Sequence, residues 1–216
     1  MNTLEDILQS EEGQYRHDIF RKLNFEFKPS LKILDVGCGS GYNSRIFRDV
    51  FKLDVKALDV YKHTNIEKFG LSFELGSVFE LPFADKSFDY VYAQDVLHHV
   101  DEQTQARSRH EKALQELARV VKPDGYIIIV EANRYNPLFF PHMVKLLGHD
   151  HFRHEYLVDL LNTIFKDFTL KLFEIHYYNS RVLWLWRFYE TIMERFAPRS
   201  LLAYTFAIIK GDAVRA

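Results

Sequence analysis

The chain has 216 residues, of which 47% are hydrophobic and 27% are charged, an ordinary globular balance that excludes a disordered polymer. Its length suits one domain with a substantial buried core. The formal net charge is −2, so the composition offers no basic surface, and we expect no nucleic-acid partner. The single cysteine, Cys38, excludes an internal disulfide, and neither an apolar signal core nor a long apolar run is present, so we expect a cytoplasmic protein.

Hydrophobic spacing predicts helices that alternate with strands along the first two thirds of the chain. The first 30 residues are polar with helical spacing, so we expect an N-terminal helical cap. The stretch between the second and third predicted strands is so short that any helix there must be short or absent. In chain order we predict a strand at 31–36, a glycine turn, a helix at 43–51, strands at 55–60, 71–75 and 88–93, a helix at 102–121, a turn at 122–125 and a strand at 126–131.

The last third of the chain has a less regular pattern. Prolines, a glycine and several histidines in 134–154 predict a long loop with a short helix. After it we expect a helix at 155–166, an edge strand at 168–178, a helix at 181–196, inserted between the last two strands, and a final strand at 201–210. Because strands alternate with helices, the predicted fold class is α/β, a doubly wound sheet with helices on both faces.

The most specific motif is Asp-Val-Gly-Cys-Gly-Ser-Gly at 35–41. It closes a predicted strand and opens a helix, which is where doubly wound sheets bind nucleotide-like ligands. Glycine lets the backbone turn tightly and approach a ligand closely. Asp59 ends the second predicted strand, at a spacing from Asp35 close to the ~20 residues expected for a carboxylate that binds ribose hydroxyls.

The glycine spacing also separates classes of ligand. The three glycines alternate, and Tyr42 stands where a dinucleotide fingerprint has its third glycine, which argues against a nicotinamide cofactor. No Gly-Lys-Ser/Thr follows, so the turn is not the phosphate loop of nucleotide hydrolases.

Four segments in the same order resemble the motifs of class I S-adenosylmethionine-dependent methyltransferases. The resemblance covers about residues 30–133, and it is strongest to the small-molecule branch that includes the ubiquinone and menaquinone biosynthesis methyltransferases. The matching segments are Leu-Asp-Val-Gly-Cys-Gly-Ser-Gly at 34–41, Leu-Pro-Phe-Ala-Asp-Lys-Ser-Phe-Asp at 81–89, Val-Leu-His-His-Val at 96–100 and Leu-Ala-Arg-Val-Val-Lys-Pro-Asp-Gly at 117–125.

This resemblance implies a Rossmann-like seven-stranded sheet whose last strand is antiparallel, with S-adenosylmethionine as cofactor and S-adenosylhomocysteine as product. It implies that the glycines line the methionine part of the cofactor, Asp35 anchors its amino group, Asp59 binds the ribose and Val78 lies beside the adenine. Ser77 stands where the family usually has an aspartate. The implied cofactor residues are Asp35, Gly37, Cys38, Gly39, Gly41, Asp59, Val60, Ser77, Val78 and Gln94.

No shift in composition marks a second domain, so we expect residues 1–216 to form a single domain. Within it, 1–30 would be the cap and 31–133 the cofactor-binding core. Residues 134–154 and 180–198 would form a lid on the substrate side.

Histidines are the candidate general bases for an acceptor that must lose a proton. His98 and His99 follow the fourth strand, and we prefer His99 because one of the two should face the cleft, although both could instead pack the next helix. The histidines of 142–154 could form a polar lid or touch substrate, and we assign no metal site. The candidate substrate contacts are Tyr135, Asn136, His151 and Trp184, and Tyr15 and Arg16 could close over the cofactor.

The helix at 181–196 is more apolar than one sheet contact requires. It could be packed in the core, cover a hydrophobic substrate, form the face of a homodimer or contact a membrane surface peripherally. These alternatives stay open at the level of the sequence.

The function that these features favour is in-line methyl transfer to a small, lipophilic or amphipathic acceptor. The alternatives are a cofactor-binding protein without catalysis and a nicotinamide-dependent oxidoreductase. The sequence does not separate oxygen, nitrogen and carbon acceptors.

Overall fold

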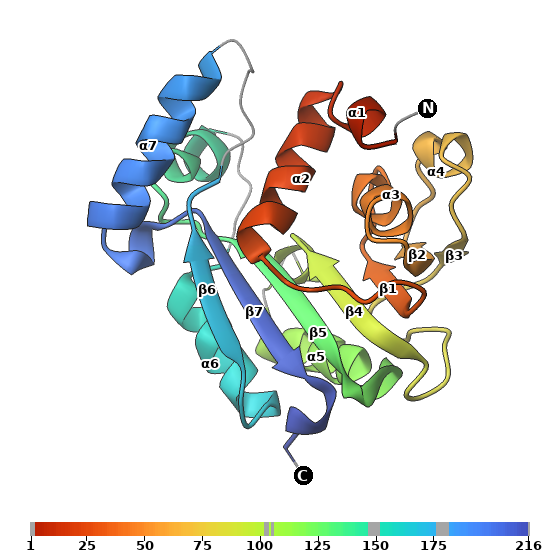
Figure 1. Cartoon of the computed structure of the whole chain (residues 1–216). Coiled ribbons are helices and arrows are strands. Elements are labelled where there is room, and N and C mark those ends of the chain that lie inside the picture. The colour runs from red at the N-terminus through yellow and green to blue at the C-terminus, as the bar shows by residue number, and fades with distance from the viewer. Residues whose placement is uncertain (1–2, 102–103, 105, 147–151, 176–181, 216) are drawn as a thin grey trace.

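The computed structural model describes residues 3–101, 104, 106–146, 152–175 and 182–215. Its centre is a seven-stranded sheet in the order β3-β2-β1-β4-β5-β7-β6, with β7 antiparallel to both of its neighbours (Figure 1). The prediction of an α/β, Rossmann-like sheet with an antiparallel last strand is therefore confirmed. The strands are β1 (Lys32–Val36), β2 (Asp54–Asp59), β3 (Phe73–Leu75), β4 (Phe88–Gln94), β5 (Val121–Ala132), β6 (Thr169–Phe173) and β7 (Tyr204–Lys210).

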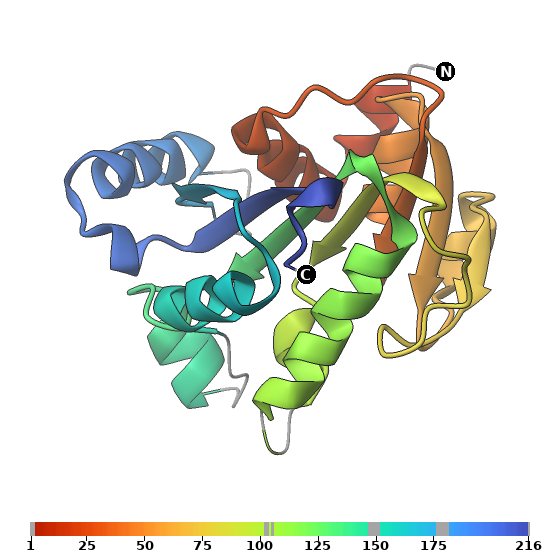
Figure 2. The same ribbon diagram turned by 90° about the horizontal axis from the view of Figure 1, so that it is seen from below.

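The helices lie on both faces of this sheet (Figure 2). The α-helices are α1 (Thr3–Ile7), α2 (Glu11–Leu23), α3 (Tyr42–Asp49), α4 (Thr64–Lys68), α5 (Arg107–Val120), α6 (His154–Ile164) and α7 (Leu183–Phe196). A π-helix forms at η2 (Phe140–Leu146), and short 3-10 helices form at η1 (Leu97–His99), η4 (Arg199–Leu201) and η5 (Gly211–Ala213). Two predictions are confirmed: the helix between β2 and β3 is short, and α7 is inserted between β6 and β7. No helix in the described part of the chain is long and apolar enough to cross a membrane.

The central strand β5 explains how the two faces are filled. Ile127 and Ile129 belong to the core that contains the buried side chains of α5 and α6, whereas Ile128 and Val130 belong to the core beneath α2 and α3. Because successive side chains of a strand point to opposite faces, a strand covered on both sides must be apolar throughout. The continuous apolar run of this strand follows from that position.

Several element boundaries differ from the predictions, and two of these differences change the sheet. The turn predicted at 122–125 lies inside β5, because Val121 already pairs with Phe88 and the next pair is Tyr90 with Tyr126, which leaves a bulge between them. A Cβ on Gly125 would lie 2.4 Å from the carbonyl oxygen of Asp89, so glycine is required where the bulge crosses β4. The strand β6 ends at Phe173, before the predicted end at 178, and residues 176–178 lie outside the described part.

Candidate active site

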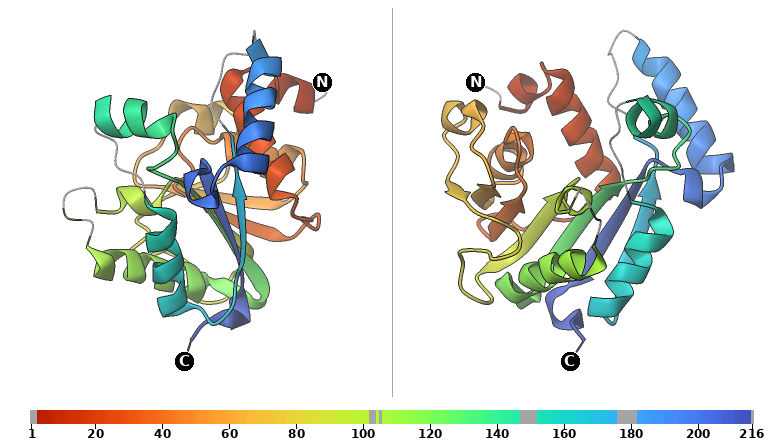
Figure 3. Two further views of the ribbon diagram at one scale, coloured as in Figure 1. Left: turned by 90° about the vertical axis from the view of Figure 1, so that its left-hand side faces the viewer. Right: turned by 180° about the vertical axis from the view of Figure 1, so that it is seen from behind.

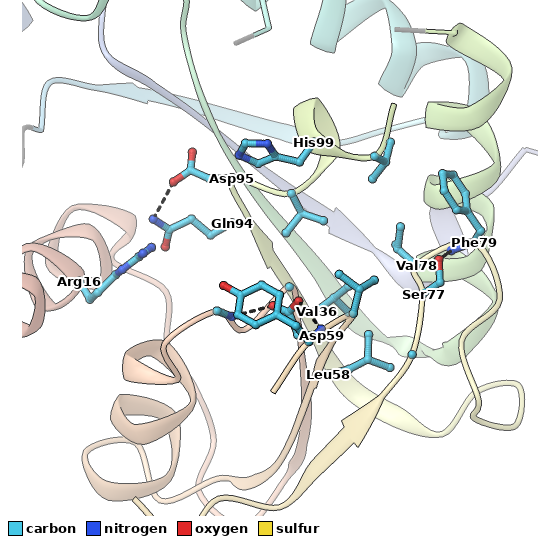
Figure 4. Close-up of a pocket in the computed structure, with 17 residues that line it drawn as sticks. Arg16, Val36, Leu58, Asp59, Ser77, Val78, Phe79, Gln94, Asp95 and His99 are labelled. Carbon is cyan, nitrogen blue, oxygen red and sulfur yellow. Dashed lines mark hydrogen bonds between the residues drawn. The ribbon is translucent and has the colours of Figure 1, made fainter. Parts of the chain in front are cut away.

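A pocket of about 690 Å³ lies at the carboxyl ends of β1, β2 and β4 (Figure 4). Parallel strands end together at this edge, and their connecting turns diverge, which is the usual ligand position in an open α/β sheet. The residues that line the pocket are Arg16, Val36, Gly37, Gly39, Leu58, Asp59, Val60, Tyr61, Gly76, Ser77, Val78, Phe79, Gln94, Asp95, Val96, His99 and Val100.

Two glycines of the turn after β1 form part of the pocket wall. Gly37 has φ +66°, and a Cβ there would lie 2.4 Å from Val96 Cγ2. Gly39 has φ +50°, and its missing Cβ faces open space. The backbone of this turn can therefore touch a ligand directly, and it adopts left-handed conformations that favour glycine.

The other two residues predicted for this turn lie behind it. Gly41 begins α3 at φ +79°, and a Cβ there would meet Ile66 and Leu71 at 2.9 Å. The Cys38 side chain is buried in a small cluster with Ala57 and Ile66, and burial raises the pKa of its thiol. Neither residue lines the pocket.

Asp59 connects the end of β2 to the glycine turn. Its side chain is nearly buried, Oδ2 accepts a hydrogen bond from the Gly39 N–H at 2.8 Å, and Oδ1 accepts one from the Tyr61 N–H at 3.4 Å. Asp59 lines the pocket, and so do Val60 and Tyr61, which follow it in the sequence. It can accept hydrogen bonds from ligand hydroxyls while it fixes the turn.

Asp35, by contrast, lies fully inside the protein. Ser44 Oγ donates to Asp35 Oδ2 at 2.5 Å, and the residue is not part of the pocket lining. Burial disfavours the charged carboxylate and raises the pKa of Asp35 to about 7. The group therefore supports the turn from behind, through α3.

Replacing Asp35 by asparagine is expected to remove part of the pH dependence of stability in the ligand-free protein. The raised pKa means that the contribution of Asp35 is full below the pKa of the unfolded chain and is lost as the pH rises toward about 7. Between about pH 4.5 and about pH 7.5 this group should cost the native protein about 3 kcal/mol, and the variant should not show that loss. Urea unfolding at the two pH values measures the difference, and parallel losses in both proteins would contradict the assignment.

The wall opposite Asp59 comes from the segment after β3. Val78 is buried, and Ser77 Oγ accepts a hydrogen bond from the Phe79 N–H at 3.3 Å. Together with Leu58 of β2, these residues form a mostly apolar side of the pocket. A flat aromatic ring could be buried there between aliphatic side chains.

The end of β4 supplies two polar side chains to the pocket: Gln94, which the sequence predicted, and Asp95, which it did not. Asp95 has φ +54°, accepts a hydrogen bond from Gln94 Nε2 at 3.2 Å through Oδ2, and has no hydrogen-bond partner for the buried Oδ1. The predicted residue Gln94 also lines the pocket, and its Oε1 accepts from Tyr92 Oη at 2.8 Å. The position of Asp95 directly after a strand that ends at the ligand edge was the available signal.

The two adjacent histidines have different environments. His98 is buried, with Nδ1 2.6 Å from Glu131 Oε2, whereas His99 is exposed and lines the pocket. Glu131 Oε1 also accepts from the N–H groups of Val96 and Leu97, at 3.1 and 2.8 Å. A possible metal-ligand group is formed by Asp95, His98 and Glu131, whose side-chain atoms lie close together. The hydrogen bonds of Glu131 to His98 and to the N–H groups of Val96 and Leu97 give it another role, because they fix η1 and so orient His99.

The N-terminal helix α2 completes the pocket. Arg16 lines the pocket, and its Nη2 lies 3.7 Å from Glu12 Oε1. The Nε of Arg16 is buried without a hydrogen-bond partner. Tyr15 is hydrogen-bonded to Tyr204 of β7, whose hydroxyl lies 3.5 Å from Asp95 Oδ2. In the view of Figure 4, Arg16, Asp95 and His99 lie toward one end of the pocket and Ser77 and Val78 toward the other.

Residues 34–129 match the family model described as a methyltransferase domain. This range contains the glycine turn, Asp59 and His99, which the structure brings to one pocket. This match bears out the resemblance of the sequence to class I S-adenosylmethionine-dependent methyltransferases. The matched range and the pocket coincide at the edge of the sheet that carries the glycine motif.

Relatives of known name cover only part of this chain. A demethylmenaquinone methyltransferase of Renibacterium salmoninarum is 36% identical over 117 residues, which are 52% of this chain and 45% of that protein. A sterol 24-C-methyltransferase of Gibberella zeae is 32% identical over 126 residues, which are 54% of this chain and 31% of that protein. The chain thus spans less than half the length of these curated relatives.

A solved structure extends the similarity of the fold to almost the whole chain. The crystal structure of a SAM-dependent methyltransferase from Archaeoglobus fulgidus matches with a TM-score of 0.65 at 20% identity, over 93% of this chain and 94% of that one. At this identity the match shows the fold alone, and it extends well beyond residues 34–129.

The pocket of the methyltransferase domain has the chemistry that this cofactor requires. The open space at Gly39 leaves room for a ligand against the backbone, and the Asp59 carboxylate lies beside that space. The apolar side formed by Leu58 and Val78 suits a nucleobase. The residues present therefore fit S-adenosylmethionine.

Of the four predicted substrate contacts, the three that the structure describes do not line this pocket. Asn136 is fully buried, and its Nδ2 donates to Glu174 Oε1 at 2.9 Å and to the Leu201 carbonyl at 3.0 Å, so it stabilises the loop after β5. Tyr135 is 41% exposed, Trp184 is 73% exposed, and neither lines the pocket. The residues His149 and His151 lie outside the described part, and so does the side chain of His142.

Proposed function

We propose that the protein transfers a methyl group from S-adenosylmethionine to a small apolar or amphipathic acceptor. The observation that carries the proposal is a single pocket that joins the glycine turn and Asp59 to the exposed imidazole of His99. When bound, the cofactor supplies a methyl group that its sulfonium has already activated.

The cofactor end of the pocket would be held by the glycine turn and Asp59. Gly37 and Gly39 would present their backbone to the methionine part, and Asp59 would accept hydrogen bonds from the ribose hydroxyls. Val78 would pack on the adenine. Asp35, buried behind the turn, would hold the backbone of this end in place through Ser44.

The acceptor end would be formed by His99 and Asp95. His99 is the exposed member of the histidine pair, and Glu131 fixes the turn that carries it, so its imidazole is positioned to take a proton from a hydroxyl or an amine. The uncompensated Oδ1 of Asp95 would accept a hydrogen bond from the acceptor or stabilise positive charge that develops on it.

The lining favours an acceptor with little charge. Valine, leucine, tyrosine and phenylalanine supply eight of the 17 residues that line the pocket, and Arg16 is the one lysine or arginine among the described residues that line it. A strongly anionic acceptor would need several fixed cations, whereas an apolar ring gains free energy at about 25 cal/mol per Å² of buried surface. Relatives named for demethylmenaquinone and sterol methylation support the same class of acceptor.

A labelled-methyl assay tests this function. The full chain is incubated with S-adenosylmethionine labelled on its methyl group and with two pools of acceptors, one of quinols, phenols and sterols and one of sugar phosphates and polar amines. We expect label in the apolar pool, with S-adenosylhomocysteine released in equal amount. Label in the polar pool would overturn the acceptor class, and cofactor binding without label in either pool would favour a binding protein without catalysis.

A further inference from the structure

The helix α7 is oriented with its charged side toward the protein. Arg187 Nη2 lies 2.6 Å from Asp18 Oδ2 of α2, and Lys22 of α2 pairs with Glu190 at 3.3 Å and also with Glu194. Glu190 is 3% exposed, so these ion pairs lie within the contact between the two helices. Figure 1 and Figure 3 show α7 beside α2, past the edge strand β6.

The opposite side of α7 is apolar and faces outward. Five large side chains at helical spacing are exposed there: Trp184 (73%), Leu185 (48%), Phe188 (62%), Ile192 (40%) and Phe196 (70%). The other positions on this side are Thr191 and Arg195, so it carries no acidic residue. We call these seven residues the outer face of α7. Of the four alternatives that the sequence left open, packing in the core is wrong for this side.

A contiguous apolar surface of this kind usually marks a contact with another molecule. Two basic side chains indicate which molecule. Arg195 on the outer face and Arg199 in the following turn η4 are both exposed, and neither has an ion-pair partner in the described part of the chain. An apolar stripe that contains tryptophan, flanked by free arginines and lacking carboxylates, complements the acyl chains and the phosphates of an anionic bilayer surface.

We propose that α7 docks the protein on an anionic phospholipid surface, with its outer face in the boundary between headgroups and acyl chains. Arg195 and Arg199 then contact lipid phosphates, and the ion pairs to Asp18 and Lys22 transmit the attachment to the body of the protein. This inference is independent of the acceptor and of catalysis.

The size of the outer face argues against a second copy of the chain. A stable interface uses about 20–30 residues and about 800 Å² on each partner. One face of a helix of 14 residues, with five apolar side chains, provides a fraction of that. The paired copies would also bring Arg195 and its symmetry mate close together without an acidic partner on this face.

The docking also has a consequence for the pocket. The helix α2, which holds α7 through Asp18 and Lys22, is the helix that places Arg16 in the pocket wall. A lipid surface at α7 would therefore be separated from the pocket by α2. If the proposed function holds, an apolar acceptor dissolved in the bilayer is close to the site that methylates it.

The two tryptophans of the chain, Trp184 and Trp186, both lie on α7, so selectively excited tryptophan fluorescence reports on this helix alone. The full chain is mixed with vesicles of phosphatidylcholine and with vesicles that contain about a third phosphatidylglycerol. We expect a blue shift of the emission and cosedimentation with the anionic vesicles, and weaker binding to the zwitterionic ones. No shift and no cosedimentation with either vesicle would overturn the proposal.

Matched variants locate the contact. Trp184→Ser combined with Phe188→Ser should lower the vesicle partition coefficient at least about tenfold, because each removes a large apolar group from the lipid contact. Leu75→Ser removes a leucine that is 63% exposed at the opposite edge of the sheet and should leave partitioning unchanged. Arg195→Gln with Arg199→Gln should abolish the preference for anionic vesicles. Thermal melting identifies any variant that fails to fold, and the arginine pair then remains as the test.

A second copy remains distinguishable from lipid. Analytical ultracentrifugation of the wild type and of the Trp184→Ser, Phe188→Ser variant compares their masses without vesicles. We expect a monomer in both cases. A wild-type dimer that the double substitution dissociates would assign the outer face to self-association and overturn the lipid contact.

Discussion

Replacing Asp59 by asparagine is expected to weaken the binding of S-adenosylmethionine and S-adenosylhomocysteine by about 100-fold or more. Each hydrogen bond from a ribose hydroxyl to a carboxylate contributes about 1.5–3 kcal/mol, and the uncharged amide replaces one of the acceptor oxygens with a donor. Because Asp59 also accepts from Gly39, the substitution should loosen the glycine turn as well.

Calorimetric titration with S-adenosylhomocysteine measures this change. Asp54→Asn is the matched control, because Asp54 begins the same strand at the end away from the pocket. The control should keep wild-type affinity. An affinity of the Asp59 variant within twofold of wild type would remove Asp59 from the cofactor site.

For an acceptor that must lose a proton from oxygen, His99→Ala should lower kcat by about 10²–10⁴-fold while cofactor affinity stays unchanged. The imidazole lines the pocket and its turn is held by Glu131, so the substitution removes the proton acceptor while the turn stays in place. Single-turnover kinetics with labelled cofactor separates this step from binding.

The neighbouring histidine provides the contrast. His98 is buried and bonded to Glu131, so His98→Ala should lower the melting temperature as well as activity, whereas His99→Ala should lower activity alone. A His99→Ala protein with wild-type turnover would assign the proton to another group or show that the acceptor needs no base.

The order of elements was predictable because each strand and helix carries its own hydrophobic period. The glycine turn was predictable because left-handed backbone near a ligand restricts the sequence to glycine, as Gly37 and Gly39 show. The bulge at 122–125 was not predictable, because the shift in pairing depends on the register between β4 and β5, which the local sequence does not encode.

The direction in which side chains point was less predictable than the elements that carry them. The sequence of α7 shows a charged face and an apolar face. The charged face lies inside because it forms ion pairs with Asp18 and Lys22, which are about 170 positions away in the chain and which a local pattern does not reveal. Asn136 follows β5, whose end borders the ligand edge, yet its amide is bonded to Glu174, which directly follows β6. The position of Asp95 after β4 was a signal in the sequence, but its left-handed backbone (φ +54°) is a conformation that the sequence does not predict for a non-glycine residue.

The most direct test of the account is a crystal structure of the full chain grown with S-adenosylhomocysteine. We predict that the ribose hydroxyls are bound by Asp59, that the methionine part lies against Gly37 and Gly39, and that the sulfur faces the side of the pocket that carries His99 and Asp95. A ligand bound with its ribose away from Asp59, or with its sulfur directed away from His99, would contradict the assignment of this pocket as the site of methyl transfer.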